Sequence, residues 1–137
     1  MLTQASVVDG TLGTATVPNP LFMPCRSAGG AAMGLQAGIL GGQGLNNIGL
    51  LMSAAGRVIY IDASPTPQFF TISDGSKVSD SDGHPGIRIW APGMIPSWLQ
   101  EGDFVTVTGI SSCYTSGADL YPRVWVRTAE DIVKQVE

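Results

Sequence analysis

Charge is scarce in this chain of 137 residues, because charged side chains make up only 13% of it, roughly half the share that soluble domains usually carry. The seven basic and eleven acidic residues give a net charge of −4. Proteins that bind nucleic acid through its phosphates are normally basic, so this balance argues against such a partner. Long apolar runs are missing as well. No stretch approaches the roughly 18 residues of a membrane-spanning helix, and we expect no membrane span.

The residues that most often carry enzyme chemistry are also few. His84 is the only histidine, and Cys25 and Cys113 are the only cysteines, with no CxxC motif. A zinc site needs more histidine and cysteine ligands than these. His84 stands alone in a turn-like Asp-Gly-His-Pro-Gly sequence, so we expect no nucleophile paired with a histidine base. Neither a Walker A motif nor a GxSxG elbow occurs. The sequence therefore predicts a protein that is not an enzyme and has no tightly bound cofactor.

The two cysteines allow two interpretations. An even pair, far apart in a chain rich in glycine and threonine, fits one Cys25–Cys113 disulfide in an oxidising compartment. Such a bond closes a loop of about 88 residues and stabilises the fold by roughly 4 kcal/mol in the chain-entropy description. The other interpretation is two buried free thiols. We take the disulfide as our prediction, and with it an extracellular or cell-surface location.

Glycine and proline divide the chain into three parts. The 18 glycines and 9 prolines are spread along the sequence, which indicates many turns. Residues 11–17 have strand propensity and are ended by Pro-Asn-Pro at 18–20, so we expect residues 1–24 to form an extended arm. Residues 25–48 are glycine-rich but carry apolar side chains, which predicts a segment that wraps the domain rather than a linker. Residues 49–137 form the domain itself.

The pattern of that domain is five strands. Alternating and β-branched residues predict strands at 49–62, bent at Gly56, and at 68–72, 86–90, 103–110 and 120–127. One helical turn is expected at 96–100, and a short C-terminal helix after Thr128, a plausible N-cap. This element order is that of an OB-fold. The predicted fold is therefore all-β, an OB-fold-like five-stranded Greek-key barrel with an extended N-terminal arm and a short C-terminal helix.

Three segments carry a resemblance to known proteins. Residues 44–51 (GLNNIGLL), 71–76 (TISDGS) and 107–113 (VTGISSC) resemble OB-like modules of secreted and surface proteins of Armatimonadota-type bacteria. The resemblance covers about residues 20–133 and implies an exported OB module, without implying a function. In that family the module often follows another barrel of the same kind, and residues 5–24 look like the last strand and exit of such a barrel.

One loop has part of a calcium-binding pattern. Calcium loops place Asp or Asn ligands at alternate positions before a glycine, and Asp80-x-Asp82-Gly83 is half of that pattern. The third early ligand and the closing bidentate glutamate are missing. The alternatives are a calcium site at Asp80 and Asp82 or a solvated loop between strands, and calcium is the one ion that the sequence leaves open.

Arginine and tryptophan share one side of two predicted strands. With a period of two, Arg123, Trp125 and Arg127 point to one side of their strand, and Arg88 and Trp90 share a side of theirs. If the intervening valines and isoleucines face the core, these five side chains form an outer surface. Such a surface fits a protein interface, a stacking platform for sugars or bases, or a plain solvated face.

Two functions follow from these features. The first is a non-enzymatic extracellular structural module that assembles with itself. Its arm, through Leu12, Thr14, Thr16 and Val17, would add a strand to a neighbouring subunit, and repeated head-to-tail contacts would give a filament or surface polymer. The alternative is an OB-type binding module for a glycan or single-stranded nucleic acid, with nucleic acid disfavoured by the net charge.

Overall fold

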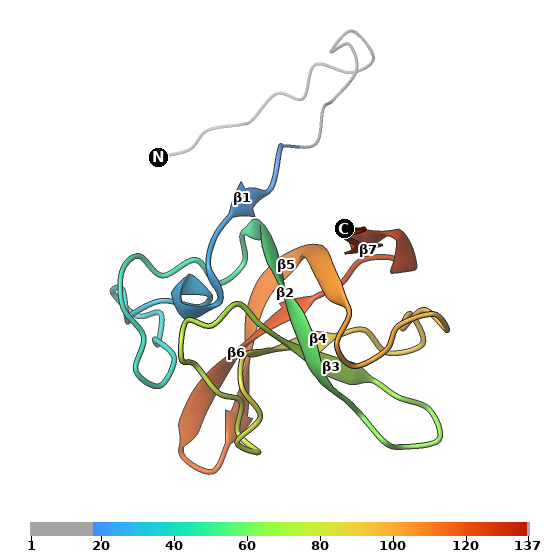
Figure 1. Ribbon diagram of the computed structural model, residues 1–137. Coiled ribbons are helices and arrows are strands. Elements are labelled where there is room, and N and C mark those ends of the chain that lie inside the picture. The colour runs from blue at the N-terminus through green and yellow to red at the C-terminus, as the bar shows by residue number, and fades with distance from the viewer. Residues whose placement is uncertain (1–17, 137) are drawn as a thin grey trace, which may run out of the picture.

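The computed structural model of the protein describes residues 18–136, which fold as a mixed β-sheet (Figure 1). The elements in chain order are β1 (Leu21–Phe22), the 3-10 turn η1 (Cys25–Ser27), β2 (Leu51–Ile61), β3 (Phe69–Ser73), β4 (Ile87–Trp90), β5 (Phe104–Ser116), β6 (Asp119–Trp125), the 3-10 turn η2 (Ala129–Asp131) and β7 (Ile132–Lys134). The prediction of an all-β chain is confirmed. Within residues 18–136, no helix has the length and apolar character needed to cross a membrane.

The strands form one seven-stranded sheet over the described residues. Their order is β1-β2-β3-β4-β6-β5-β7, and β2 also pairs with β5. The pairings are antiparallel except for β1 with β2 and β4 with β6, which are parallel. All five strands that the sequence predicts are present, and the fourth of them runs on to Ser116. The short strands β1 and β7 are additions at the two ends of the order.

The long strand β2 changes partners near its middle. It pairs with β5 up to Arg57 and with β3 from Arg57 onward. Gly56 lies at this change, where a Cβ atom would be 2.8 Å from the carbonyl oxygen of Ser73. The irregularity in register falls between Val58 and Tyr60 rather than at Gly56. Gly56 is therefore required by the close approach of β3, and the predicted bulge lies a few residues further along.

The predicted C-terminal helix is wrong. Residues after Thr128 make a single 3-10 turn, in which the Thr128 N–H donates to the Asp131 carboxylate at 3.3 Å. The chain then continues as β7, antiparallel to β5. The start signal at Thr128 is real, but the free edge of β5 pairs with the β-branched residues Ile132 and Val133. The expected helical turn near residue 96 is a turn closed by the Leu99 N–H on Pro96.

The core lies on the inner side of the curved sheet. Val124 and Val126 are buried, as are Ile87 and Ile89, so the predicted inward positions are confirmed. Other fully buried side chains come from the remaining long strands: Met52, Val58, Phe70, Ile72, Val105 and Val107. Because strand residues alternate, the positions between the buried ones face outward.

The glycine-rich segment 25–48 lies against one side of the sheet (Figure 1). Buried Asn47 fastens it there: its Oδ1 accepts from the Gly29 N–H at 2.8 Å and from the Ser111 hydroxyl of β5 at 2.7 Å. Its Nδ2 donates to the Ser27 carbonyl at 2.7 Å. At Gly30, where φ is +79°, a Cβ would collide with the backbone of Leu45. One amide and one close backbone crossing thus fix a segment without regular secondary structure.

The predicted disulfide is also wrong, because Cys25 and Cys113 are both free. Cys25 is fully buried, and its Sγ donates to the carbonyl of Ile72 at 3.8 Å. Burial, followed by the nearby Asp74 charge, raises the pKa of the Cys25 thiol to about 12. Cys113 lies on β5 opposite Pro122 of β6 and is half-buried. The side chain of Cys25 is thus turned to β3, while Cys113 belongs to the β5–β6 ladder.

The end of the predicted arm packs on its own chain. Leu21 and Phe22 pair in parallel with Met52 and Ser53 of β2, and the Met23 N–H donates to the Ser53 carbonyl at 3.0 Å. The four arm residues expected to join a neighbouring subunit, Leu12, Thr14, Thr16 and Val17, lie outside the described residues.

Candidate binding face

The outward side chains of four adjacent strands form a continuous aromatic surface. We define the aromatic–arginine face as Phe69 of β3, Arg88 and Trp90 of β4, Tyr114 of β5, and Tyr121, Arg123 and Trp125 of β6. Strand register places them side by side: Arg88 pairs with Arg123, Trp90 with Trp125, and Tyr114 with Tyr121. Because every one of these residues alternates with a buried or core-facing position, the face is the outer surface of the sheet.

Arg123 lies against the two indole rings of this face. Its guanidinium carbon is 5.0 Å from the ring centroid of Trp90 and 5.0 Å from that of Trp125. The two indoles meet edge to face at 6.3 Å. Contacts of this kind contribute about 0.5–2 kcal/mol, depending on how far the cation is desolvated.

Arg123 has no acidic partner among the described residues. No carboxylate of residues 18–136 forms an ion pair with it, and its buried Nε has no hydrogen-bond acceptor. Burial, with the positive charge of Arg88 as a further cause, lowers the pKa of Arg123. The positive charge of this side chain is therefore balanced only by aromatic rings, which leaves it available to an anionic or hydroxyl-rich ligand.

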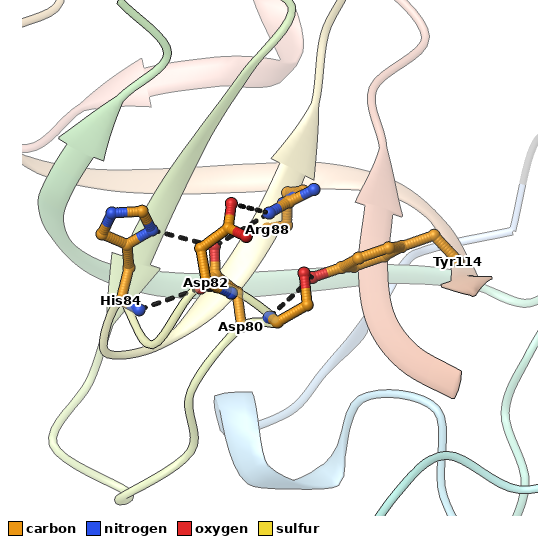
Figure 2. Close-up of polar contacts among 6 residues, drawn as sticks. Asp80, Asp82, His84, Arg88 and Tyr114 are labelled. Atoms are coloured by element: carbon orange, nitrogen blue, oxygen red, sulfur yellow. Dashed lines mark hydrogen bonds and ion pairs between the residues drawn. The ribbon is translucent and has the colours of Figure 1, made fainter. Parts of the chain in front are cut away.

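Arg88, in contrast, is paired with carboxylates, while its buried Nε also has no acceptor among the described residues. Its guanidinium carbon lies 4.0 Å from the Phe69 ring and 4.4 Å from the Tyr114 ring. Its Nη2 donates to Asp80 and to Asp82, at 3.1 Å in each case (Figure 2). Two arginines directly opposite each other would repel, and the two aspartates relieve this by neutralising Arg88. Its role is to hold the rings and the neighbouring loop in place.

Asp80 is the centre of the loop between β3 and β4. Its side chain is fully buried, and its carboxylate accepts from the N–H groups of Asp82 and His84, both at 2.9 Å. It also contacts Nδ1 of His84 at 3.2 Å and Nη2 of Arg88 (Figure 2). Burial alone would raise the pKa of Asp80, but the hydrogen bonds from His84 and Arg88 hold it below its usual range. The loop is thus organised around one ionised carboxylate.

These contacts do not fit calcium. Ligand atoms of Asp80, Asp82 and His84 lie within 4.8 Å of one another. However, the Arg88 guanidinium bonds to both carboxylates, and both oxygens of Asp80 already accept hydrogen bonds. Calcium prefers six to eight oxygen ligands, whereas one member here is a ring nitrogen. In this structure Asp80 and Asp82 anchor Arg88, and a calcium site there stays a prediction.

Four of the five residues that strand parity predicted come together, and one does not. Arg88, Trp90, Arg123 and Trp125 all belong to the face. Arg127 follows the end of β6 and forms a fork with Asp131 through Nε at 3.0 Å and Nη2 at 2.8 Å. Within residues 18–136, no hydrogen bond or ion pair joins Arg127 to the other four, and its place in an interface stays a prediction.

Sequence reasoning missed the other aromatic members. Tyr114 and Tyr121 stack at 5.7 Å between centroids, and Phe69 continues the face to Tyr60 at 6.1 Å. Tyr60 in turn stacks on the His84 ring at 3.9 Å. Phe69 and Tyr121 have the parity of the outward positions on their strands, so that signal was present. Which of these side chains lie next to one another depends on the register between paired strands, and alternation along a single strand does not determine that register.

A second surface is apolar and lies near β1. Leu21 is 57% exposed, Phe22 69%, Leu45 82% and Leu50 48%. A groove of about 320 Å³ runs between Leu21, Leu45 and Leu50. This surface adjoins the point at which residues 1–17 join the described chain.

Comparison with known proteins gives no family for this chain. No protein-family model matches it, and no curated protein matches it.

Proposed function

We propose that the chain is a non-enzymatic carbohydrate-binding module of OB type, which holds a sugar chain on its aromatic–arginine face. The observation that carries the proposal is Arg123, a cation without a described acidic partner, set between two indoles of which Trp125 is 44% exposed. Exposed tryptophan and arginine at the centre of a patch are typical of binding hot spots. The proposal places the protein outside the cell or at the cell surface, where polysaccharides are available.

The order of strand pairings supports the OB type. Each of β2, β3, β4, β6 and β5 pairs with the next, and β5 pairs again with β2. In a five-stranded Greek-key barrel of this kind, the second and third strands carry the ligand face. These positions correspond to β3 and β4, which supply Phe69, Arg88 and Trp90.

A glycan fits this face better than single-stranded nucleic acid does. Both ligands stack on aromatic rings, but a nucleic acid also needs several cations along its phosphates. The described chain offers one unpaired arginine on the face, in a protein of net charge −4. Sugar rings pack on flat apolar side chains that also carry a polar group at the edge, as Trp and Tyr do.

The test compares two exposed tryptophans. Trp125→Ala removes an indole from the face, while Trp98→Ala removes one from the turn between β4 and β5, where Trp98 is 40% exposed. Glycan-array screening of the full chain selects an oligosaccharide, and calorimetry measures its affinity. We expect Trp125→Ala to weaken binding about thirtyfold, as for a hot spot of about 2 kcal/mol, and Trp98→Ala to leave it unchanged.

Two results would contradict the carbohydrate proposal. If both substitutions weaken binding equally, the face is not the site. If the chain binds an oligothymidine more tightly than any oligosaccharide of the array, the ligand is nucleic acid instead.

Self-assembly is a second candidate function, favoured by the apolar surface near β1. We propose that residues 11–17 of a second copy occupy the groove beside Leu21, Leu45 and Leu50, because these residues have strand propensity and directly precede that surface. Sedimentation of the full chain and of a chain lacking residues 1–17 tests this. Association that depends on residues 1–17 supports it, and equal sedimentation of the two chains refutes it.

A further inference from the structure

A hollow lies between the glycine-rich segment and the loop that follows β3. Two cavities of about 370 Å³ and 630 Å³ meet there and share four lining residues: Arg26, Gly41, Lys77 and Val78. We call this hollow the cationic groove. Its remaining polar lining includes Gln43 and Ser76 on one side and Ser79 and Tyr121 on the other.

The groove concentrates positive charge in an acidic protein. Among the described residues, Arg88, Arg127 and Lys134 form ion pairs with carboxylates. The four described cations that do not are Arg26, Arg57, Lys77 and Arg123. Two of these four, Arg26 and Lys77, line the same hollow. Two like charges beside a concave surface with no counter-ion in the described structure raise the local positive potential.

The nearby carboxylates form no ion pair with Arg26 or Lys77. Asp80 lines the groove, but its oxygens are bonded within the loop to His84 and Arg88. Asp74 accepts from the N–H groups of Cys25 at 2.8 Å and Ser76 at 3.0 Å. Each carboxylate is thus turned toward donors within its own loop or toward the Cys25 N–H, and Arg26 and Lys77 have no direct acidic partner among the described residues.

Lys77 is held in a conformation that lysine rarely adopts. Its φ of +63° is the only positive value at a non-glycine residue among those described. A left-handed conformation costs a residue with a Cβ about 1–2 kcal/mol relative to glycine. Such strain often lies at functional positions. Lys77 lines both cavities, and its ammonium group is what lysine adds there over a less strained glycine.

The groove continues the aromatic–arginine face. Tyr121 lines the groove and also stacks on Tyr114 at 5.7 Å. Tyr114 in turn lies 6.0 Å from the guanidinium carbon of Arg123. A ligand that extends from Trp125 past Arg123 and over Tyr121 therefore reaches Arg26 and Lys77.

We infer that the cationic groove binds the acidic groups of the glycan that lies on the aromatic–arginine face, so that the ligand is a polysaccharide bearing carboxylate or sulfate groups. This inference rests on the proposed function. It adds the substrate class: Trp90, Trp125 and Tyr121 contact the sugar rings, and Arg26 with Lys77 contacts the oxyanions. Lysine and arginine side chains are the usual donors to both kinds of oxyanion.

The test uses two double variants with the same change in charge. Arg26→Gln with Lys77→Gly removes both cations of the groove, and the glycine relieves the strained φ. Arg57→Gln with Lys134→Gln removes two cations elsewhere, since Arg57 donates to the Gly102 carbonyl and Lys134 pairs with Asp103. Thermal unfolding of each variant confirms that it is folded before binding is measured.

Calorimetry of the full chain then uses an oligogalacturonate, its neutral methyl ester and a sulfated heparin oligosaccharide. We expect the wild type and the control variant to bind an acidic oligomer about tenfold more tightly than the methyl ester at low salt, an advantage that added salt reduces. The groove variant should bind the acidic oligomer no better than the ester. Preference for the carboxylated or the sulfated oligomer identifies which oxyanion the groove takes.

The outcomes separate the two claims. Binding of the ester and the acid with equal affinity by the wild type overturns the inference and leaves the carbohydrate proposal standing. Loss of the preference in the control variant as well shows that net charge, and not the groove, causes it, and also overturns the inference. If the chain binds none of the three oligomers and no glycan of the array, the proposed function itself fails. An independent readout is the amide spectrum during titration with inorganic sulfate, in which the signals of Gly41 and Val78 should move in the wild type and the control variant but not in the groove variant. Unmoved signals contradict the groove without reference to any glycan.

Discussion

Replacing Asp80 tests whether one buried carboxylate holds the binding loop. In Asp80→Ala, the N–H groups of Asp82 and His84 lose their acceptor, and Arg88 loses one of its two acids. Each unsatisfied donor costs about 1–3 kcal/mol, and breaking a buried pair costs about 3–5 kcal/mol. Since these effects overlap, we expect the free energy of unfolding to fall by about 3–5 kcal/mol. In Asp80→Asn, one oxygen remains for the two backbone donors, so the loss should be about 2 kcal/mol.

The assay is urea unfolding followed by tryptophan fluorescence, with Asp82→Asn as the matched control. Asp82 bonds to the same Arg88 nitrogen at 3.1 Å, but its side chain is 59% exposed. Exposed ion pairs contribute at most about 1 kcal/mol. If Asp82→Asn lowers the free energy of unfolding as much as Asp80→Asn does, the burial of Asp80 and its four hydrogen-bond donors do not explain the stability of the loop.

The pH dependence gives a second check on the same residue. The pKa of Asp80 is lowered in the folded protein, against about 3.9 in an unfolded chain. Its contribution is therefore fully present above the unfolded value and is lost as the pH falls through the lower folded value. The stability difference between wild type and Asp80→Asn should shrink below about pH 4. A difference that stays constant from neutral to strongly acidic pH would refute the proposed hydrogen-bonded carboxylate.

Two further predictions concern the backbone and the thiols. Gly86 has a φ of +99°, and a Cβ there would overlap the backbone of β3, so Gly86→Ala should lower the free energy of unfolding by more than about 3 kcal/mol. Gly83 has a φ of +87° but open space around it, so Gly83→Ala should lower it by only about 1–2 kcal/mol. Equal losses for the two variants in urea unfolding would contradict this. Iodoacetamide at neutral pH should label Cys113 alone in the folded chain and both thiols after unfolding. The reason is that Cys25 is fully buried, with its pKa raised to about 12. If mass spectrometry finds Cys25 labelled in the folded chain, β3 does not cover it.

The sequence alone determined the strands and their inward sides. Alternation has a period of two within one strand and needs no partner, so it located the buried Val124 and Val126 and the outward Arg123 and Trp125. The alternation of burial continues past the end of β6, with Val126 buried and Arg127 exposed, but it did not reveal that Arg127 bonds to Asp131.

Contacts between distant segments were decided by the tertiary structure. The free edge of β5 turned the expected C-terminal helix into β7, since a strand edge offers hydrogen bonds that local propensity does not count. Cys25 and Cys113 were expected to bond from their number alone, whereas the packing of Cys25 against Ile72 leaves both thiols free.

The candidate sites show the same division. Alternation along single strands identified four members of the aromatic–arginine face. That Phe69, Tyr114 and Tyr121 lie beside them follows only from the register between strands. The cationic groove had no sequence signal, because Arg26 and Lys77 come from segments that are far apart along the chain and meet only when the glycine-rich segment folds against the loop after β3. Local periodicity specifies which way a side chain points, whereas the residues that it meets depend on how whole segments pack.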